Sequence, residues 1–174
     1  TPSASSAASD VYKRQRLVSG YDTGPANGLM DAWILQHQNK ALDENGGWAA
    51  SGTTNKKLLN TLLADPYFAL SAPKSTGREY FNLEWLGRAA TTETLPPQDV
   101  QATLMALTVK TVGDALLKHQ PQAVYCCGGG VQNSALMAEL NAYVRANSNN
   151  SANFTLETTS ALGIACLLYT SPSP

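Results

Sequence analysis

The chain has 174 residues, of which 43% are hydrophobic and 14% charged, and its net charge is −1 at pH 7. This composition is typical of a globular domain with its own core and excludes a disordered chain. The basic excess of nucleic-acid-binding and membrane-surface proteins is lacking, so we expect neither kind of partner. No uninterrupted apolar run approaches the ~20 residues that a membrane-spanning helix needs.

The three cysteines stand at positions 126, 127 and 166, with no CxxC spacing and no histidine cluster beside them. This spacing argues against a zinc site. Cys126 and Cys127 are adjacent, and we interpret them as two reduced thiols of the core.

The two ends of the chain show neither a helical nor a strand period. Residues 5–15 match the in-frame translation of a transposase-type sequencing adapter, and residues 166–174 match a second translated adapter sequence. We therefore expect residues 1–15 and 166–174 to be non-native, and residues 16–165 to be a window on a longer protein.

The first half of this window begins with a strand that runs into a turn rich in breaking and capping residues. The first helix is expected to carry Leu29, Ala32, Trp33 and Gln36 on one stripe. Thr54 or Asn55 is expected to cap a short helix through Leu58, Leu59, Leu62 and Leu63. In chain order the expected elements are a strand at 17–21, a turn at 22–27, a helix at 28–38, this short capped helix, an irregular segment at 65–80 and a short helix at 81–86.

The second half holds the longest predicted helix, which Pro96 and Pro97 open and which ends near His119. A buried strand at 123–127, three glycines, a helix at 134–146 and a strand at 154–156 follow. This order predicts an α/β lobe with a partly parallel sheet. The apolar positions of the long helix recur at intervals of three and four and are Val100, Leu104, Leu107, Val112, Ala115 and Leu116.

The first candidate site is the turn Asp22-Thr-Gly-Pro-Ala-Asn27, between a strand end and a helix. A glycine there allows backbone N–H groups to approach a phosphate, and the helix N-terminus adds positive potential. Asp22 can hold hydrated Mg²⁺, and Thr23 can donate to a phosphate oxygen. An Asx-turn with an N-cap and no ligand explains the same residues.

The second candidate site is the strand followed by Gly128, Gly129, Gly130 and, three residues later, Asn133. Three residues without side chains leave room for a flat base or a ribose against the backbone, and Asn133 can reach a nucleotide or cap the next helix. The spacing differs from the dinucleotide fingerprint GxGxxG. A tight strand–helix corner without a ligand is the alternative.

The third candidate site is the polar segment between Pro73 and Phe81, which lacks the glycine spacing of a P-loop. It either orders a sugar or a partner lobe, or forms a solvated cluster of salt bridges. Its polar residues are Lys74, Ser75, Thr76, Gly77, Arg78 and Glu79.

Together these segments resemble one family, the anhydro-N-acetylmuramic acid kinases. The resemblance is collinear over 16–165, and PKSTGREYF is its least common string. The matching stretches are GYDTGPANGLMDAW (20–33), ADPYFALSAPKSTGREYFN (64–82), DVQATLMALT (99–108) and VYCCGGGVQNSALMAEL (124–140).

The resemblance implies one incomplete lobe of the actin-like ATPase and sugar kinase (ribonuclease H-like) fold, the C-terminal nucleotide-binding lobe. It implies a cytoplasmic enzyme of peptidoglycan recycling that uses ATP and Mg²⁺ to open 1,6-anhydro-N-acetylmuramic acid with water and phosphorylate it to N-acetylmuramic acid 6-phosphate. It also implies a homodimer.

Site residues carry over from the resemblance by motif. Asp22, Thr23, Gly24 and Asn27 match the second phosphate loop, with Asp22 near Mg²⁺ through water. Gly128, Gly129, Gly130 and Asn133 match the adenosine motif. The two motifs are expected to face one shared cleft.

The chain departs from the family pattern at two places. Ala26 stands where the family usually has Gly, which is tolerable if φ is negative there. Thr159-Ser160 stands where the family usually has Thr-Asp.

The first phosphate loop and the general base are expected in an N-terminal lobe that this chain lacks, so we expect the chain alone to be inactive. The alternatives are another actin-like sugar kinase or phosphatase, and a stand-alone binding lobe without enzyme activity.

Overall fold

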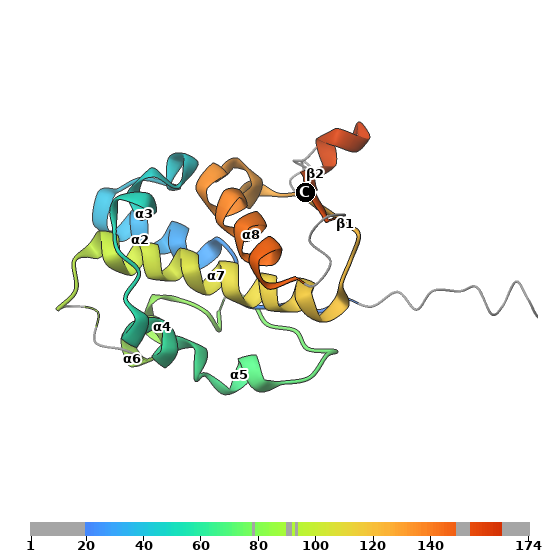
Figure 1. The fold of residues 1–174 in the computed structure, drawn as a ribbon. Coiled ribbons are helices and arrows are strands. Elements are labelled where there is room, and N and C mark those ends of the chain that lie inside the picture. Colours follow the sequence, from blue (N-terminus) through green and yellow to red (C-terminus); the bar gives the residue numbers. More distant parts are fainter. Residues whose placement is uncertain (1–19, 78, 90–91, 93, 149–153, 165–174) are drawn as a thin grey trace, which may run out of the picture.

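The computed structural model describes residues 20–77, 79–89, 92, 94–148 and 154–164 (Figure 1). The expectations for 1–15, 166–174 and most of the strand at 17–21 lie outside these residues. The described elements are α2 (Gly28–Gln38), the 3-10 helix η1 (Glu44–Gly46), α3 (Gly47–Ser51), α4 (Lys56–Leu63), α5 (Pro66–Ala69), α6 (Leu83–Ala89), α7 (Pro97–His119), β1 (Ala123–Cys126), the 3-10 helix η2 (Gly129–Gln132), α8 (Ser134–Asn147), β2 (Thr155–Thr158) and the 3-10 helix η4 (Thr159–Leu162).

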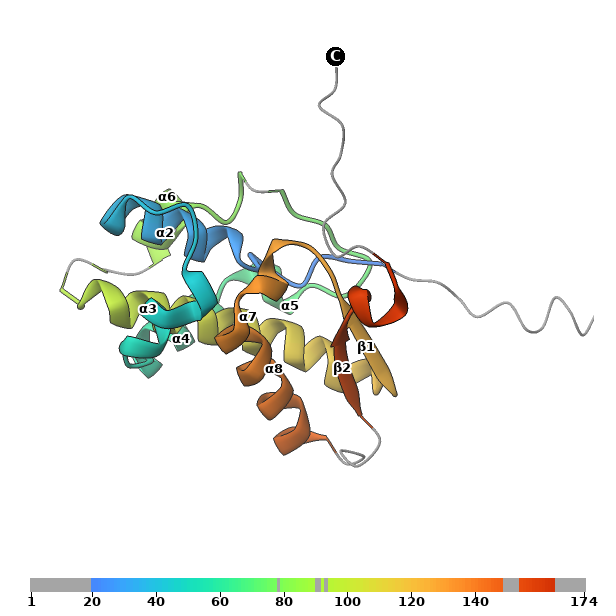
Figure 2. The ribbon, with the colours of Figure 1, turned by 90° about the horizontal axis from the view of Figure 1, so that it is seen from above.

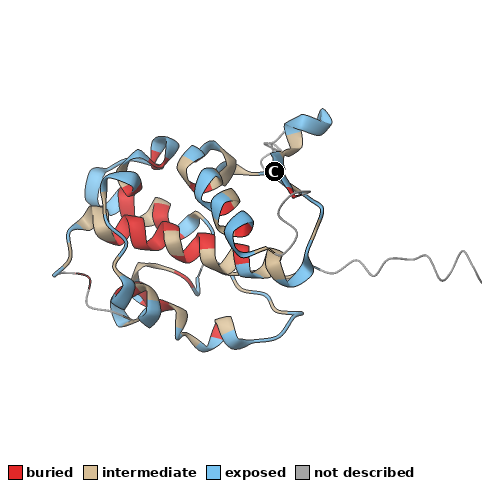
Figure 3. Cartoon of the chain, viewed as in Figure 1, coloured by how far each residue is buried: buried red, intermediate tan, exposed pale blue. Residues whose placement is uncertain are grey.

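Helix α7 crosses the middle of the molecule, with α3 and α8 on one side and α4 and α5 on the other (Figure 1). Its N-terminal half is the most continuously buried part of the fold (Figure 3). The predicted positions Val100, Leu104 and Leu107 are at most 1% exposed. The predicted positions toward its C-terminal end, Val112 and Leu116, pack on a second, smaller cluster with α8 and the sheet.

Helix α7 is also long and apolar enough to cross a membrane, with a mean hydropathy of 1.2 over 18 of its residues. It is not an uninterrupted apolar run, because Asp99, Lys110, Asp114 and Lys118 lie within it. Because 56% of that window is buried inside the protein, α7 has the pattern of a core helix rather than of a membrane span.

Strands β1 and β2 pair in parallel, in the register Ala123↔Thr155 to Cys126↔Thr158, and α8 is the crossover between them (Figure 2). This confirms the predicted β-glycine-α-β order. The prediction that the strand at 123–127 is buried is wrong, since the residues of β1 alternate between exposed and half-buried. Helices α7 and α8 cover one face of the sheet through Val124 and Leu156, while Tyr125 on the other face is 43% exposed.

The uncovered sheet face also corrects the interpretation of the cysteines. Cys126 is half-buried and Cys127 is exposed, and among the described residues neither forms a disulfide. They are not core residues, because the described part of the sheet has only two strands and one covered face.

The predicted helices are confirmed, with differences at their ends and on their faces. Helix α2 has the predicted bounds, but its buried side chains are Leu29, Met30, Trp33 and Ile34 rather than Ala32 and Gln36. Helix α2 packs on both α7 and α6, and these two neighbours together bury a wider face of α2 than a single stripe of residues. Asn55 caps α4, accepting from Leu58 N at 2.9 Å.

The helix predicted at 81–86 begins two residues later and extends to Ala89. Asn82 sets this start, because its side chain accepts from Trp85 N at 2.8 Å. The segment 65–80, predicted to be irregular, contains the single turn α5, whose N-cap is Asp65.

Candidate functional site

The turn 22–27 is held from three directions. Asp22 N donates to Lys74 O at 3.0 Å, and the Tyr67 hydroxyl donates to Asp22 O at 2.8 Å. From the other side, the Thr108 hydroxyl on α7 donates to Ala26 O at 2.8 Å. The turn is therefore fixed by contacts with segments more than 40 residues away in sequence.

Ala26 adopts φ +49°, in the left-handed region that glycine prefers. The sequence predicts that alanine is tolerable at this position if φ is negative. The observed positive φ does not meet this condition. The side chain itself meets no obstacle, since Ala26 is exposed, so the cost lies in the backbone.

The Asp22 carboxylate is exposed and accepts two hydrogen bonds on Oδ2, from the Ser75 hydroxyl and from Thr76 N, each at 2.9 Å. The Thr76 amide and then the Ser75 hydroxyl lower the pKa of Asp22 below its ordinary value, against a small opposing effect of burial. Asp22 is therefore ionised at neutral pH.

The turn, the start of α2 and the segment 76–82 enclose a groove of about 450 Å³, here called the Asp22 groove. It contains two carboxylates, and the Asn27 amide donates to that of Asp31 at 2.7 Å. Among the described residues, those that line it are Asp22, Gly24, Pro25, Ala26, Asn27, Gly28, Asp31, Ala32, Thr76, Gly77, Phe81 and Asn82.

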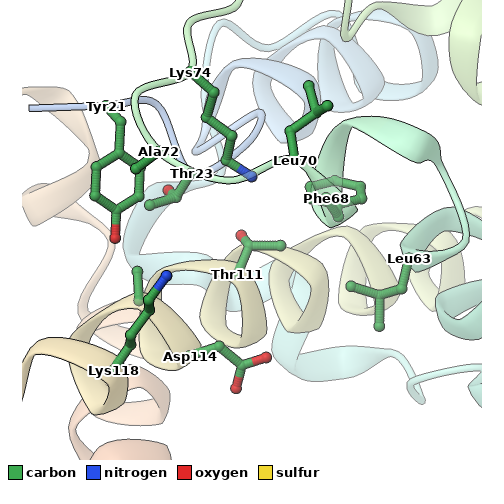
Figure 4. Close-up of a pocket in the computed structure, with 11 residues that line it drawn as sticks. Tyr21, Thr23, Leu63, Phe68, Leu70, Ala72, Lys74, Thr111, Asp114 and Lys118 are labelled. Atoms are coloured by element: carbon green, nitrogen blue, oxygen red, sulfur yellow. The ribbon is translucent and has the colours of Figure 1, made fainter.

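Thr23 does not line this groove. Together with Tyr21 it lines a separate pocket of about 200 Å³, over the C-terminal half of α7 (Figure 4). Successive residues of the turn thus serve different cavities: Tyr21 and Thr23 line the pocket, whereas Asp22 and Gly24 line the groove. Of the predicted phosphate-site side chains, the structure brings Asp22 and Asn27 together and separates Thr23 from them.

The residues of the segment 74–79 also line different cavities. Thr76 and Gly77 line the Asp22 groove, Lys74 lines the pocket of Figure 4, and Glu79 lies with Trp85 and Arg88 around another cavity. Arg78 lies outside the described residues.

Lys74 does not form the predicted salt-bridge cluster with Glu79. Its ammonium group lies 4.6 Å from the centre of the Tyr67 ring and donates to Tyr67 O at 3.1 Å. Among the described residues the ion pairs are Arg88–Glu84 and Lys110–Asp114, and neither includes this segment.

The three glycines form a corner between β1 and α8, here called the glycine corner. Gly128 has φ +88°, and Gly129 and Gly130 belong to η2. Asn133 is 9% exposed, and its side chain accepts from Leu136 N at 2.9 Å. Of the two roles considered for Asn133, the structure shows the helix cap.

The glycine corner adjoins the turn 22–27. A Cβ atom placed on Gly130 would lie 3.5 Å from Asn27 Oδ1, and Figure 2 shows η2 beside the start of α2. None of Gly128, Gly129, Gly130 or Asn133 lines the Asp22 groove itself. The two motifs are therefore neighbours that meet at Asn27, rather than opposite walls of that groove.

Sequence reasoning missed four residues that shape this region. Tyr67 and Thr108 hold the turn, and Asp31 supplies the second carboxylate of the groove. Gly46 has φ +71°, and a Cβ atom there would overlap the Asn133 side chain and Ala135. Asp31 alone was detectable, as an acidic residue in the first turn of a predicted helix.

Comparison with known proteins agrees with the resemblance. The sequence model of the family described as anhydro-N-acetylmuramic acid kinase matches residues 7–171, which extends into both terminal segments. An anhydro-N-acetylmuramic acid kinase of Xanthomonas campestris is 56% identical over 132 residues, which are 75% of this chain and 35% of that protein.

Two further relatives bear the same name. The protein of Pasteurella multocida is 54% identical over 129 residues, 72% of this chain and 34% of its own length. The protein of Chromobacterium violaceum is 51% identical over 125 residues, 70% of this chain and 34% of its own length. The chain thus spans about a third of the length of the curated relatives it matches, and by the extent of the family match it belongs to the anhydro-N-acetylmuramic acid kinase family.

Proposed function

We propose that this chain is the C-terminal, nucleotide-binding lobe of an ATP-dependent kinase with an actin-like (ribonuclease H-like) fold. The whole enzyme opens 1,6-anhydro-N-acetylmuramic acid with water and phosphorylates it to N-acetylmuramic acid 6-phosphate. The observation that carries the proposal is the turn 22–27, which presents an ionised carboxylate and the start of α2 to one groove, with the glycine corner adjoining at Asn27. The parallel β1–α8–β2 unit and the family membership support it.

The charges of the Asp22 groove fit a magnesium nucleotide. The ionised carboxylate of Asp22 would repel a bare triphosphate and attract a cation that accompanies it. Carboxylate oxygens are hard ligands of the kind that Mg²⁺ prefers, and Mg²⁺ usually takes one or two of them together with substrate phosphates. When bound, Mg²⁺ neutralises charge on the phosphates.

Each motif then has a role. Asp22 holds a water molecule of the metal, and the first turn of α2 adds positive potential near Asn27. The glycine corner accommodates adenosine, because Cβ atoms at Gly128 and Gly129 would meet only open space. Asn133 shapes this corner by capping α8. For Thr23, whose side chain lines another pocket, we propose a contact through its backbone.

The test is phosphorylation of 1,6-anhydro-N-acetylmuramic acid by the full-length protein with ATP and Mg²⁺. Asp22→Asn removes the charge while keeping the shape, and we expect kcat to fall on the order of 100-fold. Glu84→Gln, on the exposed face of α6, is the matched control and should leave kcat unchanged.

The same variant tests the metal role of Asp22, which predicts a raised KM for Mg²⁺ in Asp22→Asn. Loss of the acidic limb of the pH–rate profile would instead place the general base at Asp22 rather than in the N-terminal lobe. Full activity of Asp22→Asn would overturn the proposed site. Activity on another sugar, or on a phosphorylated sugar as a phosphatase, would favour the alternative actin-like enzyme.

The 174-residue chain alone is proposed to have no turnover, because phosphoryl transfer needs phosphate, metal, water and base held together. Product formation by the purified chain would contradict this. A cytoplasmic location follows from the use of ATP, and the proposed homodimer is tested by light scattering of the full-length protein.

A further inference from the structure

Asp22 is held at both its backbone and its side chain by one short stretch of chain, residues 67–76. The backbone of Asp22 donates to Lys74 O at 3.0 Å and accepts from the Tyr67 hydroxyl at 2.8 Å. The carboxylate accepts from the Ser75 hydroxyl and Thr76 N. The four hydrogen bonds fix both the backbone and the carboxylate of an exposed aspartate.

The hydrogen bonds to the Asp22 carboxylate end at only one of its two oxygens among the described residues. Both donors bond to Oδ2, at 2.9 Å each, and among the described residues no hydrogen bond ends at Oδ1. Asp22 lines the groove, so one oxygen orients the group while the other remains available to whatever the groove binds.

Tyr67 is a rigid support for this arrangement. It is 5% exposed, and its ring packs edge-on against Phe68 and Phe81, with centroids 6.0 and 5.3 Å away. Lys74 covers the ring and bonds to Tyr67 O, which links the tyrosine back to the segment that holds the carboxylate. The hydroxyl therefore reaches Asp22 from a side chain with little freedom of its own.

We propose that Tyr67, Ser75 and Thr76 are positioning residues that fix the Asp22 backbone and direct its Oδ1 into the groove. This inference rests on the proposed function, in which Asp22 holds a water molecule of the metal. It also gives the segment 74–79 a role: residues 74–76 order the aspartate rather than bind the sugar directly. Fixing a reacting group before the reaction lowers the entropy lost in the transition state, so the effect belongs in kcat more than in KM.

The kinetic test uses the full-length protein. Tyr67→Phe and Ser75→Ala each remove one hydroxyl, and we expect kcat to fall about tenfold while KM for the sugar changes less than about twofold. Ser75→Thr restores the hydroxyl and should recover most of the loss. Tyr80→Phe is the control, because its hydroxyl bonds to Asp65 rather than to Asp22.

A second test uses the 174-residue chain and needs no activity. We expect the ¹³C carboxyl signal of Asp22 to titrate below the ordinary range, and the midpoint to rise in Ser75→Ala because a donor to the charged form is lost. The Asp22 amide should exchange with solvent about tenfold faster in Tyr67→Phe than in Tyr80→Phe.

The two tests separate the failure of this inference from failure of the proposed function. If the wild-type protein does not phosphorylate the anhydro-sugar, the proposed function fails, and the titration and exchange measurements still decide whether Asp22 is positioned. If the wild type is active and Asp22→Asn is impaired, but Tyr67→Phe and Ser75→Ala match the wild type in kcat, the positioning role is overturned.

Discussion

Ala26 shows how a single backbone conformation sets the geometry of the turn. Two features impose its φ of +49°. The Thr108 hydroxyl on α7 donates a hydrogen bond to its carbonyl, and α2 begins two residues later, at Gly28. A left-handed alanine costs roughly 1–2 kcal/mol, which the surrounding contacts offset.

Ala26→Gly should therefore stabilise the chain, by about 1 kcal/mol, because glycine adopts this conformation without a Cβ penalty. The measurement is the free energy of unfolding in urea. Ala138→Gly, at an exposed position inside α8, is the control and should destabilise by about 1 kcal/mol. Destabilisation by both substitutions would show that Ala26 does not need a left-handed backbone.

Among the elements, the polar residues of α7 decide where its neighbours lie. Thr103 accepts from Asn55 N at 2.9 Å and so fixes the start of α4, while Thr108 fixes the turn 22–27. Gln101, fully buried, donates to Asp43 at 3.4 Å, and Asp43 in turn accepts from Trp48 N and Ala49 N at the start of α3. Three buried polar side chains on one helix thus set the positions of three other segments.

Asp65 joins α5, α6 and the segment that leads into α6. Its carboxylate accepts from Tyr67 N at 2.8 Å, from the Tyr80 hydroxyl at 3.0 Å and from the Trp85 indole at 2.8 Å. Burial pushes the pKa of Asp65 upward, but the three donors, of which Trp85 is the strongest, outweigh it and leave the pKa below the ordinary value.

Asp65→Asn should destabilise the chain by about 2 kcal/mol, since an amide cannot accept three hydrogen bonds in the same geometry. Because the folded pKa is lower than the unfolded one, the contribution of Asp65 is present above about pH 4 and is lost as the pH falls through the folded pKa. Urea unfolding at several pH values measures both effects. A decline in acid as steep in Asp65→Asn as in the wild type would contradict this assignment, and Glu84→Gln serves as the control.

At the scale of the whole molecule, the sheet is the least covered part. Strand β1 and the 3-10 helix η4 lie at the same end of the molecule (Figure 2). Tyr125 in β1 is 43% exposed, Leu162 in η4 52%, and Ile164 just after it 54%. The chain spans about a third of the length of the curated relatives that it matches.

The isolated chain should therefore bind a hydrophobic dye such as ANS more strongly than the full-length protein does, because an exposed apolar patch is normally covered by a partner segment. The double substitution Tyr125→Ser and Ile164→Ser should reduce dye binding to the chain, and Leu35→Ser, which removes a separate exposed leucine on α2, should not. Equal dye binding by the chain and the full-length protein would show that this end stays uncovered.

The local features of the fold followed from the sequence alone. The bounds of α2, the proline start and the end of α7, the Asn55 cap and the glycine corner between strand and helix all depend on residues within a few positions of one another, where periodicity and capping chemistry decide the structure. The family was recognisable from strings of the same short range.

The geometry of the candidate site was decided only by the tertiary structure. The left-handed conformation of Ala26, the assignment of Thr23 to another pocket and the exposure of Cys127 all depend on which segments pack beside them. The hydrogen bonds that orient Asp22 join residues 45 to 54 positions apart, across a separation at which propensity carries no information and only packing around α7 brings the partners together.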